Sequence, residues 1–312
     1  MVLDETAEIT CYKMSTITPP ANDAGNPSVP RLYRLGDLLE DFASDAAEAH
    51  EAYQTGTARG PVTGFKILDR EISGALMPGL HVIHGGPGCG KTALALQIAA
   101  CCGTPALFVS CEIAPLEIIR RMAARVTGTY LGRFKTGELA PAEAVTLARR
   151  ACESAPLLAL ADGTAGFPDP AWILQQALVV KGDARNILLV VDSLHTWAAR
   201  AEWGKTEYET LNLGLAELEK LAGALQAPLV TISERNRASM TGGGLNAGKG
   251  TSRIEYAGES VIGLNYADEK NKEADVNGEI ALTMRIEKNR HGSKGKSLDI
   301  LFHGAMQRFL EG

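Results

Sequence analysis

The stretch His84-Gly85-Gly86-Pro87-Gly88-Cys89-Gly90-Lys91-Thr92 lies between two apolar runs, Leu80 to Ile83 and Ala93 to Ala100. Its glycines, lysine and threonine have the spacing of a P-loop. A strand that enters a helix through such a turn aims backbone N–H groups and the positive end of the helix dipole at one point. The sequence therefore predicts a polyphosphate site formed by Gly85, Gly86, Pro87, Gly88, Cys89, Gly90, Lys91, Thr92 and Ala93, with Lys91 on the β/γ-phosphates and Thr92 on Mg²⁺.

Composition limits the class of protein. The chain has 312 residues, 45% of them hydrophobic, and a formal net charge of −6. That length suits one large domain with a small appendage, and the charge gives no global sign of nucleic-acid binding. No apolar stretch approaches the roughly 20 residues of a membrane span, and the N-terminus does not look like a signal peptide. We therefore expect a cytoplasmic protein that does not enter a membrane.

Three regions follow one another along the chain. Residues 1–30 are rich in proline and polar residues and are expected to form a flexible tail. Residues 31–60 contain an amphipathic pattern from Leu35 to Tyr53 and then a turn-rich linker, which together predict a linker helix and its tether. Residues 61–312 are expected to form the ATPase domain.

Within the third region, short apolar runs alternate with helical patterns. This alternation predicts an α/β fold with a mostly parallel, twisted sheet flanked by helices. Residues 279–288 and 297–302 predict a β-hairpin on the edge of that sheet. The six expected core strands are Leu80–His84, Ala106–Ser110, Leu157–Ala161, Ile187–Asp192, Leu229–Ser233 and Ser260–Tyr266.

Two acids lie at the carboxyl ends of expected strands. Asp192 ends an apolar strand and, placed beside the P-loop strand, would hold Mg²⁺ through water. Glu112 follows the strand Ala106–Ser110, so it would emerge at the same carboxyl edge of the sheet as the phosphates. It is a candidate base for hydrolysis, because no acid directly follows Asp192. The alternative is that Glu112 only complements a helix dipole.

Residues 62–310 resemble the RecA-type motor domain of DnaB-like replicative helicases, including the shorter RepA-type proteins. The resemblance rests on the P-loop, the Asp192 strand and five further segments, which occur in the same order: 63–69, 108–113, 135–139, 232–237 and 288–292. It implies that the chain binds ATP with Mg²⁺, that Glu112 polarises the attacking water, and that Arg121 contacts the nucleotide base.

The same resemblance implies a role for residues around Glu234. The family usually has glutamine at this position, where it senses the γ-phosphate, so the role of Glu234 is open. The glycine-rich loop from Met240 to Arg253 then corresponds to the family's binding site for single-stranded DNA. Lys249 falls at the position of a phosphate-binding arginine, with Gly250 and Arg253 beside it. An ordinary surface loop is the alternative.

The string Lys288-Asn289-Arg290-His291-Gly292 resembles the hairpin that RecA-type rings insert into the nucleotide site of the neighbouring subunit. Lys288 and Arg290 would then neutralise charge on the transferring phosphate. A similar string occurs in RadA-type branch-migration ATPases.

These expectations describe a ring-forming, ATP-dependent DNA helicase that moves along single-stranded DNA as a homo-oligomer, a hexamer. Only about sixty residues precede the Thr63 segment, which favours a helicase of a phage, plasmid or other mobile element and leaves coupling to a primase or a replication initiator open. The alternatives are a RadA-like recombination ATPase and a nucleotide-switched assembly ATPase of the KaiC or loader type.

Overall fold

The computed structural model describes residues 32–234, 257–268 and 273–311. The chain divides into two compact units, residues 1–44 and 45–312, which are described separately. The helix expected from Leu35 to Tyr53 is confirmed as a 3₁₀ turn, η1 (Leu35–Leu38), that continues into α1 (Leu39–Thr55). None of its residues is buried, and Leu35, Leu39, Phe42 and Tyr53 are all exposed.

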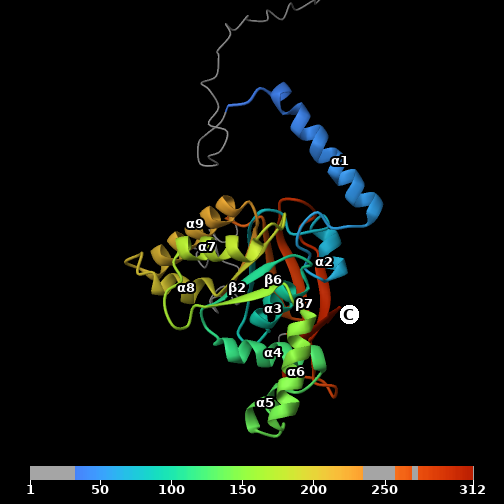
Figure 1. The fold of residues 1–312 in the computed structure, drawn as a ribbon, viewed down its shortest axis with the longest axis vertical. Coiled ribbons are helices and arrows are strands. Elements are labelled where there is room, and N and C mark those ends of the chain that lie inside the picture. Colours follow the sequence, from blue (N-terminus) through green and yellow to red (C-terminus); the bar gives the residue numbers. More distant parts are fainter. Residues whose placement is uncertain (1–31, 235–256, 269–272, 312) are drawn as a thin grey trace, which may run out of the picture. The chain divides into compact units, whose positions relative to one another are not determined.

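The unit from residue 45 onward contains a nine-stranded sheet with helices on both faces (Figure 1). Its strands are β1 (Gly79–Gly85), β2 (Ala106–Ser110), β3 (Leu158–Asp162), β4 (Leu188–Asp192), β5 (Pro228–Glu234), β6 (Ser260–Tyr266), β7 (Glu279–Asn289), β8 (Ser297–His303) and β9 (Arg308–Glu311). Its helices are α2 (Lys66–Glu71), α3 (Lys91–Cys101), α4 (Pro115–Thr127), α5 (Leu131–Thr136), α6 (Pro141–Ser154), α7 (Pro170–Lys181), α8 (Leu194–Arg200) and α9 (Glu207–Leu225), with a 3₁₀ turn η2 (Gly304–Met306).

The strand order is β3-β2-β4-β5-β1-β6-β7-β8-β9. The six strands from β3 to β6 pair in parallel, and β7, β8 and β9 add antiparallel to them. The expected α/β fold and its six core strands are therefore confirmed, with ends that differ by at most one residue. Their apolar runs are continuous because both faces of the sheet are covered.

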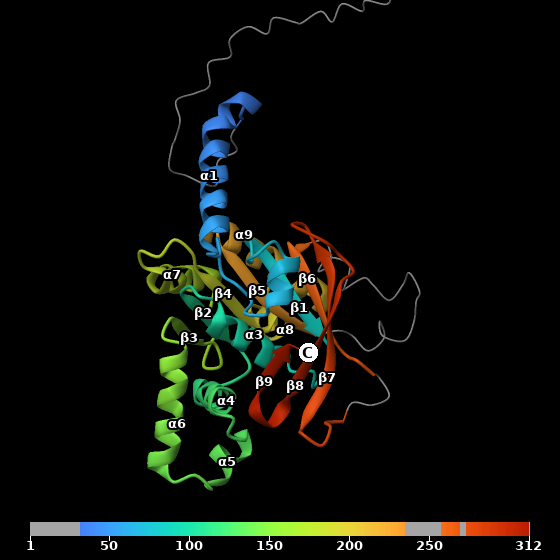
Figure 2. The ribbon, with the colours of Figure 1, turned by 90° about the vertical axis from the view of Figure 1, so that its right-hand side faces the viewer.

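Each face of the sheet has its own hydrophobic core. On one face α3 and α4 pack against the strands, and on the other α7, α8 and α9 do so. Figure 1 shows α7, α8 and α9 together on one side, and Figure 2 shows β7, β8 and β9 standing side by side. This arrangement leaves the carboxyl ends of β1, β2, β4 and β5 at one edge of the sheet, where ligands bind in open α/β folds.

The expected place of the C-terminal hairpin needs a correction. The hairpin of β7 and β8 forms, but it lies inside the sheet, and β9 is the edge strand beyond it. β7 is also longer than β8, because Ile286, Lys288 and Asn289 pair with β6 beyond Arg285, the last residue of β7 that pairs with β8. β9 was missed because it has only four residues and follows Gln307, whose φ of 54° is left-handed.

Candidate nucleotide site

The P-loop connects β1 to α3 as the sequence predicts. Gly88 and Gly90 have φ values of 81° and 79°, which residues with a side chain rarely adopt. Gly85 is required for a different reason, since a Cβ there would lie 2.3 Å from the carbonyl oxygen of Leu264 on β6. The loop therefore depends on its glycines both for its turn and for its close packing on the neighbouring strand.

Lys91 is held within this loop. Its Nζ donates hydrogen bonds to the carbonyl oxygens of Gly85 and Gly86, both at 3.0 Å. The buried Cys89 thiol donates to the Gly86 carbonyl at 2.9 Å, and the Tyr266 hydroxyl reaches the Pro87 carbonyl at 3.4 Å. These contacts brace the loop and place one ammonium group at its mouth, where it can meet polyphosphate oxygens.

Asp192 ends β4 beside the P-loop. Its side chain is fully buried, and neither carboxylate oxygen has a hydrogen-bond partner of normal geometry among the described residues. Burial raises the pKa of this carboxyl to about 7, against the opposing influence of the Thr92 hydroxyl. A buried carboxylate with unsatisfied oxygens beside a threonine hydroxyl is a donor set that suits Mg²⁺, which also takes phosphate oxygens and water.

Glu112 lies just beyond the end of β2, and two hydroxyl groups hold it there. Its Oε1 accepts hydrogen bonds from Thr196 Oγ1, at 2.7 Å, and from Ser193 Oγ. Both hydroxyls come from the start of α8, directly after Asp192. Neither Ser193 nor Thr196 could be assigned to the site from the sequence, because their contact with Glu112 depends on the pairing of β2 with β4.

These groups open onto one cavity of about 400 Å³. Lys91, Thr92, Glu112, Asp192 and Glu234 line it, together with Arg121 from α4. Arg121 also lies 3.5 Å from Glu117, one turn earlier on the same helix. The structure therefore brings together the expected phosphate, metal, base and nucleobase residues.

One wall of the cavity was not predicted. It consists of Ile280 on β7, Phe302 on β8, and Gly304 and Gln307 between β8 and β9. Phe302 also stacks on Phe309, with ring centroids 4.5 Å apart, and occupies the space that a Cβ on Gly90 would need. This wall comes from a segment more than 180 residues after the P-loop, so local sequence patterns carry no signal of it.

Glu234 ends β5 and pairs in register with Gly85. Its backbone N–H points to His195 Nδ1 at 3.5 Å. Burial lowers the pKa of His195, which favours the neutral ring that can accept this hydrogen bond. Glu234 thus lies between the first glycine of the P-loop and α8, on the wall of the cavity.

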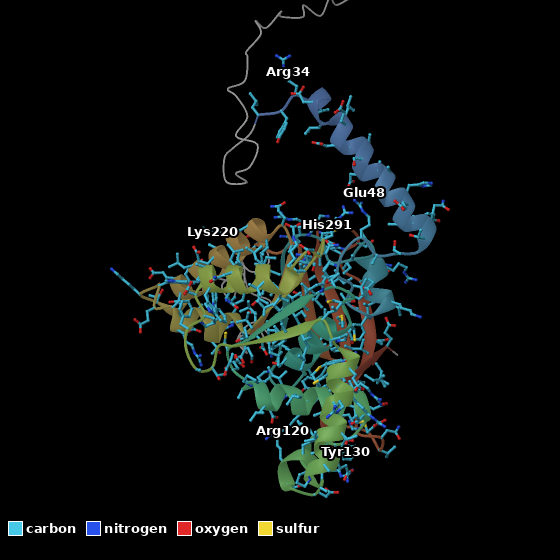
Figure 3. The ribbon with its side chains drawn as sticks, in the orientation of Figure 1. Arg34, Glu48, Arg120, Tyr130, Lys220 and His291 are labelled. Atoms are coloured by element: carbon cyan, nitrogen blue, oxygen red, sulfur yellow. The ribbon has the colours of Figure 1, made fainter. Side chains whose placement is uncertain are left out.

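Lys288 and Arg290 do not reach this cavity. Lys288 and Asn289 pair with Val261 and Ser260, the first residues of β6. They therefore lie at the amino-terminal end of the parallel strands, opposite the P-loop. Figure 3 shows their neighbour His291 at the end of the unit away from Arg120 of α4. Arg290 also has a partner in its own chain, Glu259, at 3.0 Å. The expected DNA-binding residues Lys249, Gly250 and Arg253 lie outside the described residues.

Two surveys of the described residues are negative. No helix among them is both long and apolar enough to cross a membrane. No cluster of three or more His, Cys, Asp or Glu side chains among them could hold a metal ion on its own. A divalent cation at Asp192 and Thr92 would therefore need oxygens from the nucleotide as well, which is usual for Mg²⁺.

Comparison with solved structures supports the fold. One solved ATPase domain superposes with a TM-score of 0.74 at 18% identity, covering 89% of this chain and all of that one. A DnaB-like replicative helicase, solved in a study of its interactions with primase, gives 0.71 at 18% identity, over 90% of this chain and 67% of that one. The KaiC-like protein PH0186 of Pyrococcus horikoshii OT3 gives 0.55 at 19% identity, over 82% and 99%.

Comparison of sequences identifies the family. The replicative DNA helicase DnaB of Leifsonia xyli subsp. xyli (strain CTCB07) is 25% identical over 287 residues, which are 86% of this chain and 59% of that protein. The chain thus spans about three fifths of the length of this curated relative. Residues 60–311 match the DnaB-like helicase C-terminal domain, and with the P-loop cavity in place the chain belongs to that family.

Proposed function

We propose that the protein is an Mg²⁺-dependent ATPase that uses hydrolysis to move along single-stranded DNA and to separate duplex strands. The observation that carries this proposal is the convergence of Lys91, Thr92, Glu112 and Asp192 on one cavity. Membership of the DnaB-like family supports the coupling of this ATPase to DNA unwinding.

The proposed chemistry divides among these residues. Lys91 binds the β- and γ-phosphates, and Mg²⁺ held by Thr92 and Asp192 neutralises their charge. Glu112 orients the attacking water, and Ser193 and Thr196 keep its carboxylate in place. Arg121 contacts the nucleotide base, and Glu234 senses whether the γ-phosphate is present.

The proposed assembly is a homo-oligomeric ring, a hexamer. Lys288 and Arg290 lie at the edge of the sheet opposite the P-loop of their own chain. They are therefore well placed to serve the cavity of a neighbouring copy, in which Arg290 would stabilise charge on the transferring phosphate. Head-to-tail contacts of this kind close into rings when the rotation allows.

The proposed DNA site is the segment from Met240 to Arg253, in which Lys249 and Arg253 bind phosphates and Gly250 lets the backbone approach closely. A primase or a replication initiator is a further proposed partner. The solved DnaB-like helicase whose interactions with primase were studied superposes on this chain, which supports testing a primase first.

Strand displacement on a forked DNA duplex tests the function. The protein with ATP and Mg²⁺ should separate the strands, and Glu112→Gln should not. Lys249→Ala combined with Arg253→Ala should weaken binding of single-stranded DNA and lower its salt slope by about 0.7 for each lost phosphate contact. The double variant should keep its DNA-independent ATPase rate. ATP hydrolysis without any strand separation would reject the helicase function.

The second candidate is a nucleotide-switched assembly ATPase, favoured by the similarity in fold to the KaiC-like protein PH0186. Such a protein would hydrolyse ATP and form rings without separating strands, so the same assay distinguishes the two. A RadA-like recombination ATPase would instead accelerate migration of a branched DNA junction.

A further inference from the structure

The loop after β7 is fixed against a distant part of the chain. The Asn289 side-chain amide donates to the carbonyl of Glu71 at 2.8 Å, and the Ser73 hydroxyl donates to the carbonyl of His291. Gly292 approaches so closely that a Cβ on it would lie 2.5 Å from the Glu71 carbonyl oxygen. The loop is therefore a braced structure beside the end of α2.

Glu259 binds two side chains of this loop, Arg290 and His291. Its Oε1 accepts from Arg290 Nη1 and its Oε2 accepts from His291 Nε2, each at 3.0 Å. Its carbonyl also accepts from the Arg290 backbone N–H at 3.0 Å, and its own N–H donates to Leu80 on β1 at 2.6 Å. One residue thus fixes the backbone and both side chains at the start of the loop.

The position of Glu259 is itself prepared by the fold. The Glu259 side chain is 18% exposed and packs directly against Gly79. A Cβ on Gly79 would lie 2.5 Å from Glu259 Cγ. Gly79 has a φ of 127°, which also disfavours any side chain there. Arg290 is 53% exposed, so the anchored guanidinium remains accessible from outside the chain.

Charge explains why an anion is needed at this place. Lys288, Arg290 and His291 crowd within four positions of the chain. The pKa of Lys288 is lowered by burial and by the charge of Arg290, while Glu259 opposes this shift. Without Glu259 the charges of Lys288 and Arg290 would repel each other unopposed, and we expect the Arg290 side chain to spread over many rotamers. An arginine that must meet a phosphate across an interface acts best when it is positioned beforehand.

We propose that Glu259 is a positioning residue that holds Arg290 and His291 ready for the nucleotide site of the neighbouring subunit. This inference rests on the proposed function, because it requires Arg290 to act across an interface. It makes a specific claim about direction: Glu259 acts in the subunit that provides Arg290, and it has no role in the subunit that binds the nucleotide.

The test compares Glu259→Gln with Arg290→Ala. Glu259→Gln should lower the ATPase kcat by about 10- to 100-fold and leave the affinity for a fluorescent ADP analogue unchanged. Arg290→Ala should lower the ATPase kcat by about 10³-fold or more. Glu71→Gln is the matched control, because it also removes a negative charge near the loop. The Glu71 carboxylate pairs with Arg70, whereas Asn289 of the loop contacts the Glu71 backbone carbonyl, which the substitution keeps. It should keep the parent rate.

Mixing experiments then test the direction. Rings mixed from Glu259→Gln and Lys91→Ala subunits should regain activity, because about a quarter of their interfaces join an intact P-loop to an intact Arg290 and Glu259. Rings mixed from Glu259→Gln and Arg290→Ala subunits should not exceed the residual rate of Glu259→Gln alone, since both lack a positioned arginine. Restored activity in the second mixture, or a parent rate for Glu259→Gln alone, would overturn the proposal.

Two outcomes separate this inference from the proposed function. If Arg290→Ala keeps the parent rate, the assignment of Arg290 to a neighbouring site fails. If Arg290→Ala loses its activity but Glu259→Gln keeps the parent rate, only the role of Glu259 fails. Should Glu259→Gln not assemble, Glu259→Asp undergoes the same mixing test, because it keeps the charge and retracts the carboxylate by one methylene.

Discussion

At the scale of single residues, Lys91 and Glu112 line the same cavity, and we expect them to have different roles in ATP hydrolysis. Lys91→Ala removes the ammonium group that meets the phosphates, so it should abolish both nucleotide binding and turnover. Glu112→Gln keeps the shape and the contacts to Ser193 and Thr196, so it should bind nucleotide normally and lose turnover by about 10²- to 10⁴-fold. Equilibrium binding of a fluorescent ATP analogue and a steady-state ATPase assay measure the two effects.

Glu143→Gln is the control for Glu112→Gln. Glu143 is an acid in the first turn of α6, so it has the helix-dipole role that is the alternative for Glu112. It should keep the parent ATPase rate. If Glu112→Gln also hydrolysed ATP at the parent rate, Glu112 would have only that structural role.

His81 provides a residue-scale prediction for pH. It is buried between Ser260 Oγ, at 2.8 Å from Nδ1, and the Met77 carbonyl, at 2.7 Å from Nε2. Burial lowers its pKa to about 4. The unfolded chain therefore takes up the proton first as pH falls, and stability present above about pH 6.5 is lost towards pH 4. Between pH 7.5 and 5 the loss from this group should be about 2 kcal/mol.

Urea unfolding at both pH values measures this effect. His81→Gln should remove the corresponding part of the pH dependence, whatever its effect on stability at pH 7.5. The exposed His50 on α1 serves as the control, and His50→Gln should leave the pH dependence as in the parent. An unchanged pH dependence in His81→Gln would show that other groups cause the acid sensitivity.

At the scale of elements, the contact between the P-loop and β6 should be sensitive to a single methyl group. Gly85→Ala would place a Cβ against the Leu264 carbonyl, so we expect a loss of about 1–3 kcal/mol in the free energy of unfolding. Gly132→Ala is the matched control, because a Cβ at that position on α5 meets nothing within 4 Å. It should stabilise the protein by up to about 1 kcal/mol. Urea unfolding without nucleotide compares the two.

The elements also show how far sequence reasoning reaches. The parallel strands could be predicted because each is a continuous apolar run between turn residues, and the P-loop has a fixed spacing. Ser193 and Thr196 could not be assigned to Glu112, because their contact depends on which strands are neighbours in the sheet. The cavity wall of Ile280, Phe302 and Gln307 could not be predicted for the same reason, and β9 was too short to give a periodic signal.

At the scale of the whole molecule, the residues proposed for phosphate chemistry lie at the two opposite ends of the parallel strands. Lys91, Thr92, Asp192 and Glu112 lie at the carboxyl edge of the parallel strands. Lys288 pairs with the second residue of β6, and Arg290 follows just beyond the start of that strand. The first residue of β6 pairs with His81, which is four residues before Gly85 and so about 13 Å away along the strand. This division favours a site completed by a second copy of the chain.

The linker helix provides the last prediction, because its large apolar side chains Leu35, Leu39, Phe42 and Tyr53 are exposed. Leu39 and Phe42 are 65% and 69% exposed, and they lie close to Leu35 at helical spacing. Burying a large apolar side chain contributes about 1.5–3 kcal/mol. We expect this helix to pack its apolar side chains against the neighbouring subunit of the proposed ring. Replacing both Leu39 and Phe42 by serine should therefore weaken each subunit contact by about 3–6 kcal/mol.

At micromolar protein concentration, this loss should convert rings into smaller species in multi-angle light scattering and reduce ATPase activity together with assembly. Glu40→Ser with Glu51→Ser, on the same helix, is the matched control and should keep both mass and activity. If the Leu39 and Phe42 double variant formed rings of the parent mass, the helix would not join subunits. Assembly would then have to depend on contacts within residues 61–312, since the proposed role of Arg290 at the cavity of another copy requires contact between subunits.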